Sequence, residues 1–346
     1  EKLALAVTGN DGMVYNYTVS FNGDFPYEAG KVYNSELTFG GMEDGYGTAA
    51  IFDNNVTGEA WDESDNKGSA KDNPYLIESA GHLKYLIEQV KAGEPYADKF
   101  FKLTTDIKVT ADTWTPIGIS SAKPFSGNFD GGGHTISGEL KGRFSNDIQN
   151  FGFFGYLTTK SSMLIENIHI AANITWSFAS PEGTSYSYLG VGGVIGNGYA
   201  QTITVHNCTM SGEMQISDGS LGYGYLSIGG VCGHTTGAFN NCSAIGKINV
   251  ECKGGSISIG GIVGMNRSIA NETKHCINAS SITFSNTEHS NTNYAVSVGG
   301  IGGYIAGKVL GCCNQGSITG HSLSSVDIGG IGGITELAKC HLNRNL

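Results

Sequence analysis

The chain has 346 residues and a formal net charge of −11, and 53 of its residues are glycine. Charged residues make up 15% of the sequence, against ~25% in an ordinary globular chain. An acidic balance without a Lys/Arg cluster argues against nucleic-acid binding, because phosphate recognition requires basic patches. No run of ~18 apolar residues is present, so no transmembrane segment is expected.

The first 62 residues alternate between apolar and polar side chains, as antiparallel strands do. The alternation covers residues 3–7, 14–20, 31–33 and 36–39, with Gly- and Asn-rich turns between them and Trp61 near the end. This pattern predicts a partial β-sandwich over residues 1–62. Residues 63–73 are rich in Asp, Glu, Ser, Asn, Lys and Gly, and predict a polar linker.

Residues 72–140 predict the opening of a repetitive domain, which we assign to residues 74–346. Ser79 is the predicted N-cap of a helix over residues 80–92, four apolar residues mark one face of this helix, and Gly93 ends it. Strand character returns over residues 100–109 and on both sides of a Gly-rich turn near residue 131. A short amphipathic helix would cover the exposed first turn of this domain.

One glycine-rich block recurs five times, at residues 189–196, 226–233, 257–264, 296–303 and 326–333. Its second glycines fall at positions 193, 230, 261, 300 and 330, so the spacing varies between turns. A second block follows each time and contains one recurring cysteine. These cysteines are Cys208, Cys242, Cys276, Cys312 and Cys340.

The repetition predicts an all-β fold built as a β-solenoid, in which three short segments per unit keep the period-two spacing of strands. One such turn cannot bury its apolar face alone, whereas stacked turns bury a continuous core. We expect a right-handed parallel β-helix, following the general bias of parallel crossovers. The unequal spacing predicts loops on one edge, at residues 177–188, 217–225, 251–256, 285–295 and 319–325.

Several motifs resemble those of the GLUG-motif β-helix surface proteins of Bacteroidetes. They are residues 73–77 with the following helix, residues 101–107, 114–118 and 125–138, and the Gly-Gly-Ile-Val-Gly repeats. Residues 15–19, 30–33 and Trp61 resemble the C-terminal part of a fimbrillin-like domain. The resemblance implies an extracellular or outer-membrane surface protein of adhesin type. This chain carries no anchoring signal and could belong to a larger surface polypeptide.

The five recurring cysteines predict a column inside the solenoid. A column on one strand position presents a line of sulfurs rather than the tetrahedral set that a metal requires. We therefore expect buried thiols that act as small hydrophobes and no metal. Disulfides between turns are the alternative, because the ~4.8 Å spacing of strands lies within the range of Cα separations in disulfides. Cys313 should face the opposite side from Cys312.

Asn167, Asn207 and Asn241 precede the column position, where later turns carry His275 and Gly311. We interpret these residues as an asparagine ladder at a corner of the solenoid.

Asp130 and His134 flank a run of three glycines and are interpreted as turn residues. No paired carboxylates, Ser-His-Asp spacing, HExxH or phosphate loop recurs on neighbouring turns. No catalytic residue and no cofactor are therefore predicted.

The loop edge is the best functional candidate, because tyrosine among small polar residues is a common recognition chemistry. The alternative is that these side chains only pack the loops onto the solenoid. The predicted ligand-binding residues are Tyr186, Tyr188, Tyr223, Tyr225, His289 and Tyr294.

The favoured function is a non-catalytic surface adhesin or recognition protein that presents these loops to a glycan or to a host or bacterial surface protein. The alternatives are a polysaccharide lyase or glycoside hydrolase and a structural surface spacer. Carboxylates from adjacent turns that converge in a groove would favour the enzyme.

Overall fold

The computed structural model describes residues 2–8, 14–20, 49–64, 66–178, 188–200, 202–218, 225–253, 255–287, 296–323 and 325–335. The chain divides into two units, Glu1–Gly45 and Tyr46–Leu346. In the first unit, β1 (Lys2–Thr8) and β2 (Val14–Ser20) pair in antiparallel fashion, which confirms these two predicted strands. The predicted strands at 31–33 and 36–39 lie outside the described residues, so the sandwich as a whole stays a prediction.

The described residues of the second unit form four parallel sheets. The strands of sheet 1 are β4 (Tyr75–Ile77), β5 (Phe100–Leu103), β7 (Asn128–Asp130), β10 (Met163–Glu166), β14 (Ile203–His206), β18 (Ala238–Asn240), β22 (Glu272–Lys274) and β26 (Lys308–Leu310). Those of sheet 2 are β3 (Ala50–Phe52), β6 (Ile107–Val109), β8 (Thr135–Arg143), β11 (His169–Phe178), β15 (Thr209–Asp218), β19 (Ser243–Cys252), β23 (Ile277–Asn286), β27 (Cys313–Asn314) and β28 (Ile318–Ser322). Sheet 3 comprises β12 (Leu189–Gly192), β16 (Tyr225–Gly229), β20 (Ser256–Gly260), β24 (Val296–Gly299) and β29 (Val326–Gly329). Sheet 4 comprises β9 (Phe154–Leu157), β13 (Ile195–Gly198), β17 (Cys232–Thr235), β21 (Val263–Asn266), β25 (Gly302–Ile305) and β30 (Gly332–Thr335).

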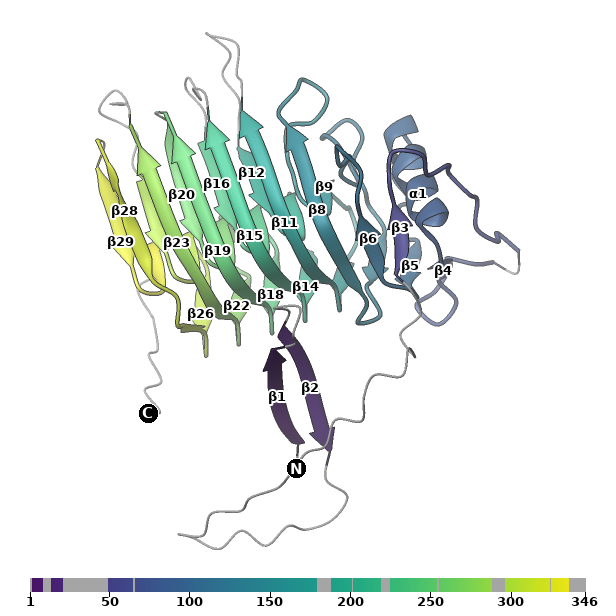
Figure 1. Cartoon of the computed structure of the whole chain (residues 1–346), viewed down its shortest axis with the longest axis horizontal. Helices are drawn as coiled ribbons and strands as arrows, with labels where there is room; N and C mark the ends of the chain where they lie inside the picture. Colours follow the sequence, from purple (N-terminus) through teal and green to yellow (C-terminus); the bar gives the residue numbers. More distant parts are fainter. Residues whose placement is uncertain are drawn as a thin grey trace, which may run out of the picture. The chain divides into compact units, whose positions relative to one another are not determined.

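The strand order shows how the turns stack. From β9 to β26, neighbours within a sheet are four strands apart along the chain, so each turn contributes one strand to every sheet. Equivalent residues of the repeat pair in register, as Leu189 does with Leu226 and Leu226 with Ile257. Figure 1 shows these strands side by side in parallel rows. The predicted all-β, solenoid-like stacking of parallel strands is thus confirmed, with four strands per turn instead of three segments.

The fourth strand comes from the glycine-rich block, which forms two strands rather than one. At the first glycine of each pair, an added Cβ would lie 2.3 Å from a backbone oxygen at Gly192, 2.1 Å at Gly229 and 2.0 Å at Gly260. In each case that oxygen is the carbonyl three residues later. Glycine is therefore needed because sheets 3 and 4 approach each other closely at this corner.

Helix α1 (Ala80–Ala92) lies where the sequence predicts it. The Ser79 hydroxyl accepts a hydrogen bond from the His82 backbone N–H, and Gly93 ends the helix at φ 112°. Such capping satisfies backbone groups that have no partner inside the helix. The buried face of α1 carries Leu83 and Leu86, and the helix packs against β3 and β4 at the first turn.

The predicted boundary between the domains is wrong, because it falls at residue 62 whereas the two units divide between Gly45 and Tyr46. Strand β3 pairs with β6 in sheet 2. Trp61 is buried, and its ring lies 5.2 Å from that of Tyr75 and 4.9 Å from that of Tyr85. Residues 49–62 therefore belong to the solenoid.

The predicted linker at 63–73 also packs on the first turns. The Gly68 backbone N–H donates to the Asn73 carbonyl, and the Phe100 N–H donates to the Gly68 carbonyl. Lys71 forms an ion pair with Glu166. The polar composition of this segment reflects its exposed position, and its backbone is nevertheless fixed by hydrogen bonds.

The asparagine corner is confirmed. Asn167, Asn207 and Asn241 have positive φ angles of 54°, 51° and 59°, and His275 and Gly311 continue the left-handed position at 53° and 59°. The Asn207 amide donates to the Asn167 side-chain oxygen at 2.8 Å, and the Asn241 amide donates to that of Asn207 at 3.4 Å. Asparagine tolerates this conformation better than most residues do, so it suits a corner that repeats on every turn.

Three cysteines of the predicted column directly precede residues that pair in register on successive turns, Thr209, Ser243 and Ile277. Cys208, Cys242 and Cys276 are buried free thiols, Cys312 is half-buried, and Cys313 is exposed. Cys340 lies outside the described residues. A hydrogen bond with the Cys242 thiol, followed by burial, raises the pKa of Cys276 to about 12. Cys276 therefore contributes a neutral, space-filling side chain at physiological pH.

Candidate functional site

Two of the predicted recognition residues meet in the structure. Tyr188 directly precedes β12 and Tyr225 begins β16, and their positions correspond because Leu189 pairs with Leu226. Their rings are stacked, with centroids 5.1 Å apart and planes at 22°. The solenoid register thus places two tyrosines on adjacent turns with their faces together. Tyr186, Tyr223, His289 and Tyr294 lie outside the described residues and stay predictions.

The structure adds His234 and Tyr199, which the sequence analysis did not select. His234 lies on β17, and its ring stacks on Tyr188 with centroids 5.1 Å apart and planes at 14°. Tyr199 directly follows β13, and its ring lies 6.4 Å from that of His234 at an angle of 15°. We call Tyr188, Tyr199, Tyr225 and His234 the aromatic row.

A repeat comparison could have indicated His234. The position directly after the last glycine of the repeat block holds Asn197, His234, Met265 and Tyr304 in successive turns. The residue type therefore changes from turn to turn at this position, while the glycine before it is kept. No comparable signal in the sequence indicates that Tyr199 lies beside it.

Hydrogen bonds orient the His234 ring. The Asn197 amide nitrogen donates to the Tyr188 backbone carbonyl at 3.1 Å and to the Asn150 side-chain oxygen at 3.4 Å. The Asn197 side-chain oxygen therefore faces His234 Nδ1, at 3.3 Å. Because an amide oxygen can only accept, Nδ1 carries the proton and Nε2 is the unprotonated nitrogen.

The environment keeps His234 neutral. Burial, followed by the charge of Arg267, lowers the pKa of His234 to about 4. Its Nε2 atom is buried and has no hydrogen-bond partner among the described residues. At physiological pH the ring is therefore neutral, and it lies between Tyr188 and Tyr199 within the row.

The ends of the row are open to solvent. Tyr199 is 56% exposed and Tyr225 is 39% exposed, while Tyr188 is half-buried. The guanidinium carbon of the exposed Arg267 lies 4.6 Å from the centroid of the Tyr188 ring, which is cation–π geometry. The row thus combines exposed aromatic faces, phenolic hydroxyls and one cation. Such a surface can stack on a flat ligand and hydrogen bond to its edges.

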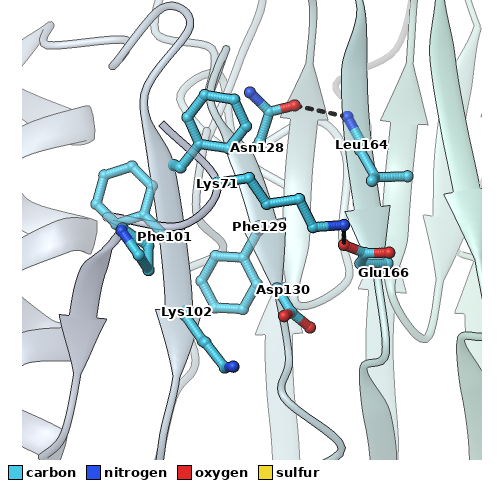
Figure 2. Close-up of a pocket in the computed structure, with 10 residues that line it drawn as sticks. Lys71, Phe101, Lys102, Asn128, Phe129, Asp130, Leu164 and Glu166 are labelled. Carbon is cyan, nitrogen blue, oxygen red and sulfur yellow. Dashed lines mark hydrogen bonds and ion pairs between the residues drawn. The ribbon is translucent and has the colours of Figure 1, made fainter. Parts of the chain in front are cut away.

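A second place with chemical potential is a hollow of about 140 Å³ on sheet 1 (Figure 2). Asp130 on β7 and Glu166 on β10 pair in register and line this hollow, together with Lys71 and Lys102. Figure 2 shows the Lys71 side chain reaching across to Glu166, and the distance between Nζ and Oε1 is 2.5 Å. Adjacent turns thus do bring two carboxylates together, which the sequence analysis did not predict.

Asp130 also holds the backbone of its turn, as predicted, whereas the His134 ring contacts the Asp106 carboxylate. The Asp130 carboxylate accepts hydrogen bonds at 2.9 Å from the Gly132 N–H and from the Asn167 amide. His134 Nδ1 lies 3.1 Å from an Asp106 carboxylate oxygen that also accepts from the Thr135 N–H. Among the residues with described positions, no three His, Cys, Asp or Glu side chains gather to hold a metal ion.

Comparison with known proteins gives limited matches. No family model matches the chain. A protein described as a candidate Gly-rich membrane protein of Evansella cellulosilytica is 33% identical over 135 residues, which cover 37% of this chain and only 14% of that protein. The crystal structure of a candidate immunoglobulin A1 protease from Bacteroides ovatus has a TM-score of 0.49 and 18% identity, and the match covers 77% of this chain and 87% of that one. In the described part of the chain, no helix has the length and hydropathy required to cross a bilayer.

Proposed function

We propose that this chain is a non-catalytic recognition module that binds glycans through the aromatic row. The observation that carries the proposal is the stacking of Tyr188 and Tyr225 from adjacent turns, with Tyr225 and Tyr199 open to solvent. A sugar ring presents apolar C–H faces to an aromatic ring and hydroxyl groups at its edge. Tyrosine and the neighbouring polar groups supply both kinds of contact.

The size of the exposed row favours a glycan over a protein partner. A stable protein interface buries ~800 Å² on each partner, whereas two partly exposed rings cover only a small area. Single sugar residues match such a surface. The alternative hypothesis for the same site is that it contacts a host or bacterial surface protein.

We further propose that the solenoid is a right-handed parallel β-helix of the GLUG type, displayed on a bacterial surface. The parallel sheets and the four-strand repeat support the β-helix. The name of the partial relative in Evansella cellulosilytica, a membrane protein, agrees with a surface location. In this setting the stacked turns would act as a rigid support for the recognition residues.

The hollow on sheet 1 supports a second candidate function, cleavage of a polysaccharide. Asp130 and Glu166 lie on adjacent turns, and a glycosidase uses two carboxyl groups that flank the bond it cleaves. A lyase would use the same hollow with Lys71 and Lys102 holding an acidic sugar. We rank cleavage second for two reasons. Lys71 already pairs with Glu166, and the hollow of about 140 Å³ is smaller than the ~300–1,000 Å³ of ligand pockets.

A glycan array combined with a depolymerisation screen on polysaccharides tests both candidates. We expect glycan binding without turnover. Tyr225→Ala and Tyr199→Ala should each lower affinity about tenfold, because each removes an exposed ring. Ile277→Ala is the matched control, since Ile277 is an exposed apolar residue on sheet 2, 44% exposed and outside the row.

The outcomes separate the candidates. Depolymerisation that Asp130→Asn or Glu166→Gln abolishes would overturn the non-catalytic proposal. Binding that survives both tyrosine substitutions would place the glycan elsewhere on the molecule. Neither binding nor turnover would leave a structural spacer as the function.

A further inference from the structure

Among the residues that the structure describes, Arg267 is a cation beside the aromatic row without an acidic partner. It directly follows β21, and its backbone N–H donates to the Thr235 carbonyl at 3.1 Å, which fixes the chain at this point. Its guanidinium group lies over the Tyr188 ring. Across the described ranges, no carboxylate lies within ion-pair distance of Arg267. No acidic side chain with a described position therefore uses the five N–H donors of the guanidinium group.

The strands of the two sheets that carry the aromatic row contain few charged residues. The strands of sheet 4 have no Asp, Glu, Lys or Arg, and those of sheet 3 have only Asp327, on the last strand. The whole chain, in contrast, carries 31 acidic residues and a net charge of −11. Arg267 thus places a positive charge beside the row on a protein of net negative charge. Such an arrangement favours an anionic ligand at this place.

We propose that the ligand of the aromatic row is an acidic glycan, whose anionic group pairs with Arg267 while a sugar ring stacks on Tyr225 or Tyr199. This inference rests on the proposed glycan-binding function and adds the class of ligand. A planar guanidinium group matches a carboxylate with two parallel hydrogen bonds, and it also binds sulfate. Uronic acids and sulfated sugars share this chemistry.

The test compares glycans that differ only in charge. Oligogalacturonate and its methyl ester have the same backbone, and heparin-derived oligosaccharides with their desulfated forms provide the sulfate comparison. Calorimetric titration should show binding of a charged form and weaker binding of its neutral counterpart. Raising the salt concentration should weaken only the charged form, because salt screens exposed charges.

Variants of Arg267 identify the residue responsible. Arg267→Gln should reduce affinity for the charged form about 10-fold to 100-fold, the range for hydrogen bonds to charged groups. Arg267→Lys should reduce this affinity less, because lysine keeps the positive charge but cannot form the bidentate pair of hydrogen bonds. Binding of the neutral form should not change. Thermal unfolding of each variant checks that the fold is intact.

Two results would overturn the inference in different ways. Equal binding of charged and neutral forms, lost in Tyr225→Ala, would reject the acidic ligand and keep the glycan-binding function. The acidic ligand would also be rejected, and the glycan-binding function kept, if the Arg267→Gln variant binds the charged form as tightly as the natural chain does. If neither form of either glycan binds, the inference fails, and the glycan array decides whether the glycan-binding function fails with it.

Discussion

At the scale of single residues, His234 shows how a buried side chain is held in one chemical state. Its Nδ1 proton is directed to Asn197, and Asn197 is in turn fixed by the Tyr188 carbonyl. Tyr188 and Tyr199 lie parallel to the imidazole ring. Protonation would place a positive charge in this buried position close to Arg267. The folded state is therefore more stable with a neutral His234 ring.

This arrangement predicts a loss of stability in acid. The pKa of His234 is about 4 in the folded chain and ~6.5 in an unfolded one. Between these values the unfolded state binds a proton and the folded state does not. The stabilisation is therefore complete above pH ~6.5 and falls as the pH drops toward 4, by up to about 3 kcal/mol.

Urea unfolding at pH 7 and pH 4.5 measures this effect. His234→Asn is the comparison, because Asn197 occupies the equivalent position on the preceding turn. The variant should lose less stability between the two pH values than the natural chain does. His169, whose pKa burial also lowers, is present in both and cancels. An identical pH dependence in both chains would contradict the assignment.

At the scale of the elements, the glycine block determines how closely one turn of the solenoid stacks on the next. An added Cβ at Gly230 would lie 2.3 Å from the Gly261 carbonyl oxygen and 2.6 Å from the Ala244 Cβ. The first contact is with backbone, which cannot rotate away. At Gly330, the equivalent position of the last described turn, an added Cβ meets nothing within 4 Å.

These two glycines make a matched pair of substitutions. Gly230→Ala should lower the free energy of unfolding by about 1–3 kcal/mol, the usual effect of overpacking. Gly330→Ala should change it by less than about 0.5 kcal/mol, as at open positions. Chemical denaturation of the two variants beside the natural chain measures the difference. Equal effects would show that the repeat glycines are not required for close packing.

Sequence spacing predicted the elements that are determined by residues within a single turn of the solenoid. Ser79 and Gly93 mark the helix through its own capping, and Asn207 marks a corner through its left-handed backbone. The stacking of His234 on Tyr188 depends on side chains from two adjacent turns, and spacing within one turn does not show it. The pairing of Asp130 with Glu166 was missed for the same reason.

At the scale of the whole molecule, the first turn of the solenoid includes residues 49–62, which the sequence analysis assigned to the preceding domain. Strand β3 completes sheet 2 at the first turn. Trp61 packs among Tyr75, Tyr85, Tyr96 and Phe101, with ring centroids 4.9 to 5.6 Å away. The residues next to Trp61 in the sequence are mostly polar, so the local composition does not predict that Trp61 is buried in the core.

Two shortened chains test where the solenoid begins. A chain that starts at residue 46 keeps β3 and Trp61, and it should unfold at the same urea concentration as the second unit of the full chain. A chain that starts at residue 63 follows the boundary predicted from the sequence and loses both elements. Its free energy of unfolding should be lower by at least about 3 kcal/mol, because removal of one buried tryptophan side chain alone has an effect of this size. Equal stability of the two chains would show that residues 46–62 rest on the solenoid without supporting it, and would restore the boundary at residue 62.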